Sequence, residues 1–331
     1  MRSALRNVES APPALSVVVP VYNEAGNAGA LCQEIGSVVQ ALAPEFEIIF
    51  VNDGSRDATL AELRALAAAE PRLRIVDLDG NFGEAAALSA GFHAARGNYV
   101  VTLDGDGQND PHDIPQLLET LHARGVRVVS GWRQRRQEST LLRVLPSRIA
   151  NALISAVTRL PVHDNGCGLK VYERALLAGI QLPKGIHRFL PAILGVRPHQ
   201  VAEVAVNDRR RQHGESHYGI SRTLIVARDV LAIRFMIANP SLFAPIFAGL
   251  TVLAGAAVLA ALASGAVLAA MIALLTDAGA AMVWWNLHRF NRAQRDGVYR
   301  VRCEYRGTGC DRPAAGEGQT GQPRDRAAAG A

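Results

Sequence analysis

The sequence predicts an α/β domain built on a mainly parallel sheet with helices on both faces, followed by an apolar hairpin of two helices. Short apolar runs alternate with helix-length segments over roughly the first 130 residues, which is the order of a parallel sheet. The predicted strands end in polar or glycine residues, so polar chemistry collects along one edge of the sheet. Farther along, residues 241–285 are almost wholly apolar, with Asp277 as their one formal charge.

Each strand is predicted from a short apolar run, and each helix from apolar residues at helical spacing. In the first part of the chain, the strands are 16–20, 46–51, 73–78 and 99–103, and the helices are 28–42, 58–69 and 85–95. Later, the pattern predicts strands at 126–130 and 203–208 and an amphipathic helical region at 141–160.

The composition narrows the classes of partner. The 331 residues carry a formal net charge of +5, and arginines cluster at 133–136, at 209–211 and beside the apolar segment. This placement indicates contact with phosphate and with a membrane surface. Nucleic acid is not expected, because aromatic residues make up only 5% and no recognition motif is present. The cysteines at 32, 167, 303 and 310 form neither a disulfide framework nor a zinc pattern, so we expect reduced thiols facing the cytosol.

An acidic stretch follows the central predicted strand. Asp104 and Asp106 flank a glycine where the chain leaves the sheet, and the amide of Gln108 follows. Ligands bind at the carboxyl ends of strands in open α/β sheets. Carboxylate and amide oxygens there are suited to Mg²⁺ or Mn²⁺ bridging a diphosphate. The alternative is an ordinary polar turn, which the Asp-Gly-Asp sequence alone favours.

Two further strand ends carry candidate ligands. Asp53 is suited to accept hydrogen bonds from a base or ribose, although residues 52–57 also fit a turn that caps the next helix, with Asp57 as the better cap. Arg133 can grip a phosphate with its planar guanidinium, whereas Arg135 and Arg136 fit a solvated basic loop equally well.

Four motifs in series carry a family resemblance. They are Val-Pro-Val-Tyr-Asn-Glu (19–24), Val-Asn-Asp-Gly-Ser-Arg-Asp (51–57), Asn-Phe-Gly-Glu (81–84) and Leu-Asp-Gly-Asp-Gly-Gln (103–108). Together they resemble the family 2 glycosyltransferases of the GT-A fold, and within them the dolichyl- or polyprenyl-phosphate sugar transferases. Each motif alone is weak, but their order and spacing cover roughly residues 15–300.

The resemblance implies roles for named residues. The nucleotide sugar would be held by Pro20, Tyr22, Glu24, Asp53, Asn81 and Asp104, and the metal and diphosphate by Asp104, Asp106 and Gln108. Gly105 stands where many members carry alanine.

In the second half, residues 164–170 resemble the family's Asp-x-x-x-Gly-Phe-Arg/Lys stretch, which places Asp164 near the sugar or acceptor. Residues 211–217 resemble a mobile basic loop that closes over phosphates, although His217 replaces the usual lysine. The implied catalytic residues are Asp104, Asp106, Asp164 and Arg211, and the implied phosphate or acceptor ligands are Arg133, Arg148, Arg211 and Ser216.

The apolar segment is long enough for two transmembrane helices, with a turn near Ser264. Arginines before and after it predict that both ends are cytoplasmic. Residues 221–238 fit either a helix at the bilayer interface or an ordinary amphipathic surface helix. We therefore divide the chain into a flexible N-terminus (1–14), a glycosyltransferase domain (15–219), a juxtamembrane amphipathic helix (220–238), two transmembrane helices (239–288) and a cytoplasmic C-terminal segment with a disordered tail (289–331).

These features predict a metal-dependent, inverting transferase in the cytoplasmic (inner) cell membrane. It would move a sugar from a nucleoside diphosphate sugar to a polyprenyl phosphate, with Mg²⁺ or Mn²⁺ as cofactor. Two alternatives remain: a family 2 enzyme with a glycan or another lipid as acceptor, and a catalytically silent scaffold that binds nucleotide sugar at the membrane. The sequence leaves open uracil against guanine, the sugar, the lipid chain length, the role of Asp277 and whether the chain forms a homo-oligomer.

Overall fold

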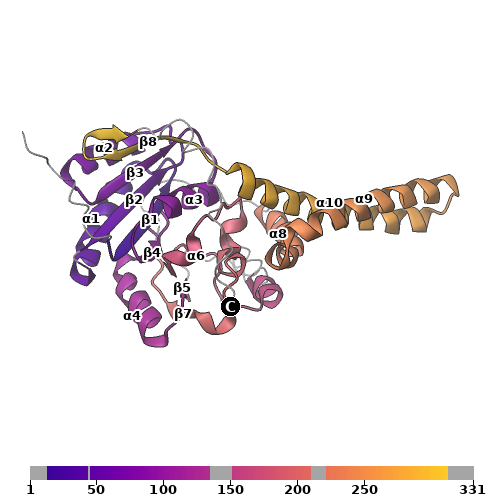
Figure 1. The fold of residues 1–331 in the computed structure, drawn as a ribbon, viewed down its shortest axis with the longest axis horizontal. Coiled ribbons are helices and arrows are strands. Elements are labelled where there is room, and N and C mark those ends of the chain that lie inside the picture. The colour runs from indigo at the N-terminus through magenta and orange to yellow at the C-terminus, as the bar shows by residue number, and fades with distance from the viewer. Residues whose placement is uncertain (1–12, 44, 135–150, 210–220, 312–331) are drawn as a thin grey trace, which may run out of the picture.

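The chain folds around one mixed sheet, with an apolar helical hairpin extending from it (Figure 1). The computed structural model describes residues 13–43, 45–134, 151–209 and 221–311, without the side chains of 221–228. Within them the sheet has nine strands in the order β7-β5-β6-β4-β1-β2-β3-β8-β9. The strands are β1 (Leu15–Val21), β2 (Phe46–Asn52), β3 (Leu73–Leu78), β4 (Tyr99–Thr102), β5 (Val128–Trp132), β6 (Lys170–Glu173), β7 (Val201–Ala205), β8 (Val301–Arg306) and β9 (Gly309–Asp311).

The centre of the sheet is parallel, as predicted. Strands β4, β1, β2 and β3 lie side by side in parallel, so their carboxyl ends meet at one edge. Strand β6 inserts antiparallel between β4 and β5, and β7 is parallel to β5. Strand β7 ends earlier than predicted. The reason is that the backbone N–H of Asn207 donates to the Asp113 carboxylate at 2.7 Å, which draws the chain out of the sheet.

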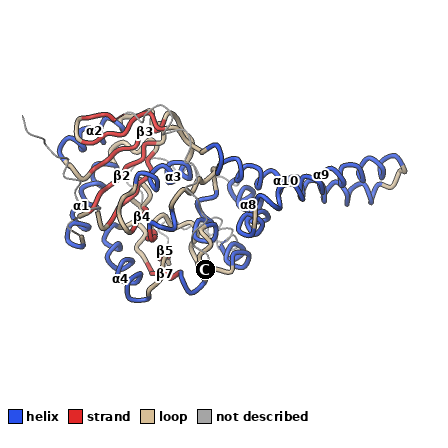
Figure 2. The backbone as a smooth tube through the Cα atoms, viewed as in Figure 1, coloured by secondary structure: helices blue, strands red, loops and turns tan. Residues whose placement is uncertain are grey.

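Helices cover both faces of the sheet (Figure 2). The helices are α1 (Ala28–Leu42), α2 (Thr59–Ala69), α3 (Glu84–Ala94), α4 (Ile114–Arg124), α6 (Arg174–Leu177), α7 (Leu190–Ile193), α8 (Ser221–Ala238), α9 (Pro240–Ala263) and α10 (Val267–Asp296), with 3₁₀ turns η1 (Pro111–Asp113), η2 (Ile186–Phe189) and η3 (Pro198–Gln200). Residues 151–158 are also helical, within the predicted region 141–160.

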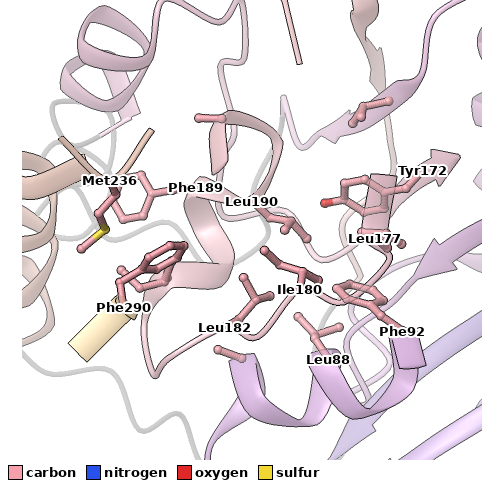
Figure 3. Packing of buried hydrophobic residues seen from close by; sticks show 14 of the residues in the cluster. Leu88, Phe92, Tyr172, Leu177, Ile180, Leu182, Phe189, Leu190, Met236 and Phe290 are labelled. Carbon is pink, nitrogen blue, oxygen red and sulfur yellow. The ribbon is translucent and has the colours of Figure 1, made fainter. Parts of the chain in front are cut away.

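The core has two parts because strand side chains alternate between the faces. On one face, Val17, Val19 and Val101 pack with α1, α2 and α4. On the other, Val18 and Val100 pack with α3, the short helices after β6, and parts of α8 and α10. Figure 3 shows this second cluster, in which residues of α3 lie opposite Met236 of α8 and Phe290 of α10.

The predicted apolar hairpin consists of α9 and α10, which pack along each other and project from the domain (Figure 1). The turn falls at Ser264 and Gly265, where it was predicted, and Gly265 takes a positive φ of 70°. Helix α9 buries none of its residues, although it is almost wholly apolar. Both helices are long and apolar enough to cross a membrane.

The described part of α8 packs on the domain through part of its surface. Val230, Ile233 and Met236 are buried at helical spacing against the domain, while Leu231 and Ile237 are exposed. Helix α8 is therefore held on the domain and still leaves apolar side chains exposed.

The region after the hairpin differs from the prediction. Residues 301–311 form β8 and β9, which extend the sheet beyond β3, whereas this region was predicted to be a segment leading into a disordered tail. Strand β8 is short and mixes charged with apolar residues, so it carries little apolar signal in sequence. Pairing of β8 with β9 places the Cα atoms of Cys303 and Cys310 5.9 Å apart, and the two residues form a disulfide. The expectation of four reduced thiols is therefore wrong for this pair. Cys32 and Cys167 are buried free thiols.

Candidate active site

The acidic loop after β4 lies at the carboxyl edge of the parallel strands. The backbone N–H of Asp104 donates to Asn109 Oδ1 at 3.0 Å, and that of Gln108 donates to Asp106 Oδ1 at 3.0 Å. Gly105 is required for close packing, because a Cβ there would lie 2.8 Å from the carbonyl oxygen of Pro20. The alanine that many family members carry at this position would therefore need the loop to shift. These contacts fix the loop against the end of β1.

The Asp104 carboxylate is enclosed by other groups of the site. A Cβ on Gly168 would lie 2.2 Å from its Oδ1, so the absence of a side chain at 168 makes room for it. Burial raises the pKa of Asp104 to about 7, and the negative charges of Glu84 and Asp106 add to this effect. Arg133 and Lys170 act in the opposite direction. The site thus holds more negative charge than its cations balance.

This donor set fits a divalent cation. Asp104 and Asp106 offer carboxylate oxygens and Gln108 an amide oxygen, which are the hard ligands that Mg²⁺ and Mn²⁺ prefer. Burial raises the pKa of Asp104 and so favours its neutral form, whereas a cation held beside it would favour the ionised carboxylate. Asp106 is only 7% exposed, so the loop holds its side chain largely buried at the edge of the sheet.

Asp53 makes contacts within the protein that the sequence did not predict, and its role in holding the nucleotide stays a prediction. Its two carboxylate oxygens accept the backbone N–H groups of Phe82 and Gly83 at 2.7 and 2.8 Å. Burial raises the pKa of Asp53, and these two hydrogen bonds and the charge of Lys184 partly offset the rise. Asp53 therefore shapes the 81–84 loop at the end of β3, a role that the sequence interpretation missed because the two segments lie about 30 residues apart.

The neighbouring loops surround an open edge. Pro20 is half-buried, Tyr22 is 39% exposed, and Asn81 is exposed. Glu24 is fixed by its turn, since its N–H donates to Thr59 Oγ1 and its carboxylate accepts from Asn27 Nδ2 at 2.7 Å. The predicted turn after β2 is confirmed, with Asp57 accepting the Thr59 N–H at 3.0 Å.

Arg133 and Asp164 form one buried ion pair. The guanidinium donates through Nε at 2.8 Å and through Nη2 at 3.2 Å, and the two side chains are 13% and 2% exposed. Burial opposes the charge on Arg133, but the Asp164 carboxylate outweighs it and raises the Arg133 pKa. Sequence reasoning selected both residues but did not pair them. Arg133 therefore faces the site as a guanidinium already oriented by Asp164.

Three residues missed in the sequence complete the surroundings. Lys170 is buried and donates to the carbonyl oxygens of Asn165 and Cys167. Glu84 pairs with His187 at 3.3 Å, and both line a cavity of about 30 Å³ together with Asp104 and Lys170. Glu84 and Lys170 lie inside two motifs noted in the sequence (81–84 and 164–170), so membership of these motifs could have identified them as site residues.

Arg148, Arg211 and Ser216, the remaining predicted phosphate or acceptor ligands, lie outside the described residues. Their roles stay predictions.

The comparisons with known proteins decide the family. The model of Glycosyl transferase family 2 matches residues 16–180. Residues 16–180 belong to glycosyl transferase family 2. This segment contains β1 to β6 and the acidic loop.

Two curated relatives extend the likeness beyond this segment. The chain is 42% identical over 224 residues to dodecaprenyl-phosphate galacturonate synthase of Rhizobium johnstonii, covering 67% of this chain and 66% of that protein. It is 37% identical over 219 residues to undecaprenyl-phosphate 4-deoxy-4-formamido-L-arabinose transferase of Pseudomonas fluorescens, covering 66% of this chain and 63% of that protein. The chain thus spans just under two thirds of the length of these relatives.

A solved structure supports the fold. Glucosyl-3-phosphoglycerate synthase of Mycobacterium tuberculosis, in complex with Mn²⁺, UDP-glucose and phosphoglyceric acid, matches with a TM-score of 0.53 and 21% identity over 68% of this chain and 79% of that one. The family 2 domain therefore has the GT-A fold, as the sequence motifs implied.

Proposed function

We propose that this protein transfers a sugar, with inversion, from a nucleoside diphosphate sugar to a polyprenyl phosphate at the cytoplasmic face of the cell membrane. The observation that carries the proposal is the acidic loop of Asp104 and Asp106 at the carboxyl edge of the sheet, in a domain attached to an apolar hairpin. The relatives named as polyprenyl-phosphate synthase and transferase support the acceptor class.

The site residues divide between the two substrates. Asp104, Asp106 and Gln108 would hold Mg²⁺ or Mn²⁺, which offsets the negative charge that develops on the leaving diphosphate. The 81–84 loop, which Asp53 fixes, would contact the nucleotide together with Pro20 near the end of β1 and Tyr22 just after it. These groups orient the donor so that its sugar carbon faces an incoming nucleophile.

The acceptor needs positioning more than activation. A phosphate monoester is already anionic at neutral pH, so it can attack without a strong general base. Arg133 is suited to orient phosphate oxygens, because its guanidinium is fixed by Asp164 and its planar fork matches their geometry. The proposed roles of Arg211 and Ser216 are to close over the same phosphates.

The hairpin supports membrane attachment. Helices α9 and α10 have 24 and 30 residues, whereas about 20 residues span a bilayer. Helix α9 buries no residue within the described structure, so its apolar surface needs another apolar environment. We place the chain in the cytoplasmic membrane as a two-span protein, with arginines at both ends of the hairpin on the cytoplasmic side.

A transfer assay tests the proposal. Purified protein in detergent is incubated with undecaprenyl phosphate, Mg²⁺ or Mn²⁺, and a panel of UDP- and GDP-linked sugars that includes uronic acids. A glycolipid that forms only with metal and only with the intact chain would support it. Nucleotide release without glycolipid would indicate another acceptor, and nucleotide binding without either product would favour the silent scaffold.

A further inference from the structure

The segment from Gln181 to Lys184 is held to the base of the apolar hairpin. Arg289 of α10 donates through Nη2 to the carbonyl oxygen of Lys184 at 2.8 Å. Gln294, also of α10, exchanges two hydrogen bonds with the backbone of Gln181: its Nε2 donates to the carbonyl oxygen and its Oε1 accepts the N–H at 3.4 Å. Both ends of this segment are therefore bonded to the same helix.

The same segment is held to α3 on its other side. The backbone N–H of Leu182 donates to Ser89 Oγ at 2.9 Å, and the Leu182 side chain is fully buried. Figure 3 shows Leu182 between Leu88 of α3 and Phe290 of α10. The segment thus bridges the hairpin and the helix whose first residue, Glu84, lines the site.

This bridge places Lys184 beside the nucleotide-side loop. A Cβ on Gly83 would lie 3.5 to 3.7 Å from the Cγ, Cδ and Cε atoms of Lys184, so the lysine stem runs over the loop that Asp53 holds. Lys184 is exposed, and its charge acts on the Asp53 carboxylate. Within the described residues, no hydrogen bond or ion pair is made by its ammonium group.

The charge balance of the site favours a role for the Lys184 ammonium group in binding an anion. An anionic substrate must enter an edge that already carries Asp53, Glu84, Asp104 and Asp106. The two cations deeper in the site are partly used within the protein. Lys170 donates to two carbonyl groups, and Nε and Nη2 of Arg133 donate to Asp164, which leaves only its other N–H groups for a phosphate. An ammonium in water, carried on a fixed backbone, is available to bind phosphate as a point charge.

We propose that Lys184 binds a phosphate oxygen of a substrate, and that α10 fixes its position through the Arg289 hydrogen bond. The inference rests on the proposed function, since it deepens the same site. The phosphate belongs either to the donor diphosphate or to the lipid acceptor. Its position over Gly83, beside the loop that Asp53 holds, makes the donor diphosphate the expected source.

Lys184→Ala and Lys184→Arg test the contact. For Lys184→Ala we expect about tenfold weaker binding of UDP or GDP in the presence of Mg²⁺, measured by isothermal titration calorimetry, because one charge-assisted contact is lost. Lys184→Arg should stay within about threefold of the wild type, since it keeps the charge. If nucleotide affinity is unchanged but the KM for undecaprenyl phosphate rises about tenfold, the lipid is the source. If Lys184→Ala changes neither quantity, the proposal is wrong.

Arg289→Gln tests the role of the helix, with Arg292→Gln as the matched control. Arg292 lies on the same helix and carries the same charge, but it pairs with Asp296 and its side chain is 70% exposed. For Arg289→Gln we expect about threefold weaker binding of the ligand that Lys184 contacts. For Arg292→Gln we expect no change in that binding. Equal effects of the two variants would refute the positioning role. Wild-type protein that binds neither nucleotide and makes no glycolipid would instead refute the proposed function.

Discussion

Replacing Gly168 by alanine should disable the site while leaving the fold intact. The new Cβ would lie 2.2 to 2.4 Å from the carboxylate atoms of Asp104, whereas ordinary contacts begin near 3.4 Å. Because the obstructed group is the end of a side chain, the carboxylate can retreat by on the order of 1 Å, at a cost in stability near the low end of overpacking, about 1 kcal/mol. A displacement of that size exceeds the tolerance of a metal–oxygen bond, about 0.2 Å. We expect a rate loss of about 100-fold.

The matched control is Gly166→Ala, whose Cβ would have its nearest neighbours, atoms of Arg133 and Asp164, at an ordinary 3.7 Å. Initial rates of sugar transfer, Mn²⁺ binding and thermal unfolding are measured for both variants. Gly168→Ala should lose turnover and Mn²⁺ affinity with an unfolding temperature near that of the wild type. Retained turnover at wild-type metal concentration would refute the geometry of Asp104. A large drop in unfolding temperature would refute the argument that the side chain absorbs the shift.

The same structure makes four further predictions. Asp106→Ala should abolish metal-dependent turnover with little change in the unfolding temperature, and turnover retained with metal would contradict its assignment as a ligand. Because the pKa of Asp104 is raised to about 7, protons should compete with metal below that pH and weaken Mn²⁺ binding by up to about tenfold per pH unit. Metal-free protein should instead gain stability as the pH falls through 7 towards 3.8, the ordinary pKa, since the folded state takes up the proton first; a calorimetric pH series checks the sign. A chain ending at residue 300 loses β8 and the Arg74–Glu304 ion pair, so in detergent it should unfold roughly 5 °C or more below a chain ending at residue 311.

The parallel sheet and the acidic loop could be predicted because their signals are local. Strands β1 to β4 are short, mainly apolar runs, and Asp104, Asp106 and Gln108 are near neighbours in sequence, so the strand end and the predicted ligands fall within one short stretch. The same holds for the apolar hairpin and its turn at Ser264. In each case the property depends on composition over a short window, not on which distant segment packs nearby.

The features that could not be predicted from the sequence depend on contacts between residues far apart in the chain. Asp53 binds the backbone of Phe82 and Gly83, and Arg133 binds Asp164 across a separation of 31 residues, so neither partner is visible in the local pattern. Strand β8 was missed for a related reason. It lies near the edge of the sheet with several side chains partly exposed, so its residues need not be apolar, and its pairing with β3 spans the whole hairpin.

The apolar hairpin is attached to the domain at two places, one before it and one after it. Before the hairpin, α8 packs on the cluster beneath the site through residues such as Met236. After it, the carbonyl oxygen of Arg300 accepts the Asp79 N–H at 2.9 Å, and β8 continues the pairing with β3. Asp79 lies directly before the 81–84 loop, so both strand β8 and the Gln181–Lys184 bridge connect α10 to this loop. A hairpin joined by one flexible linker would leave the distance from membrane to site undefined. Under the proposed function, attachment through α8 and through β8 would set that distance, which a lipid-bound phosphate would have to cross to reach Asp104.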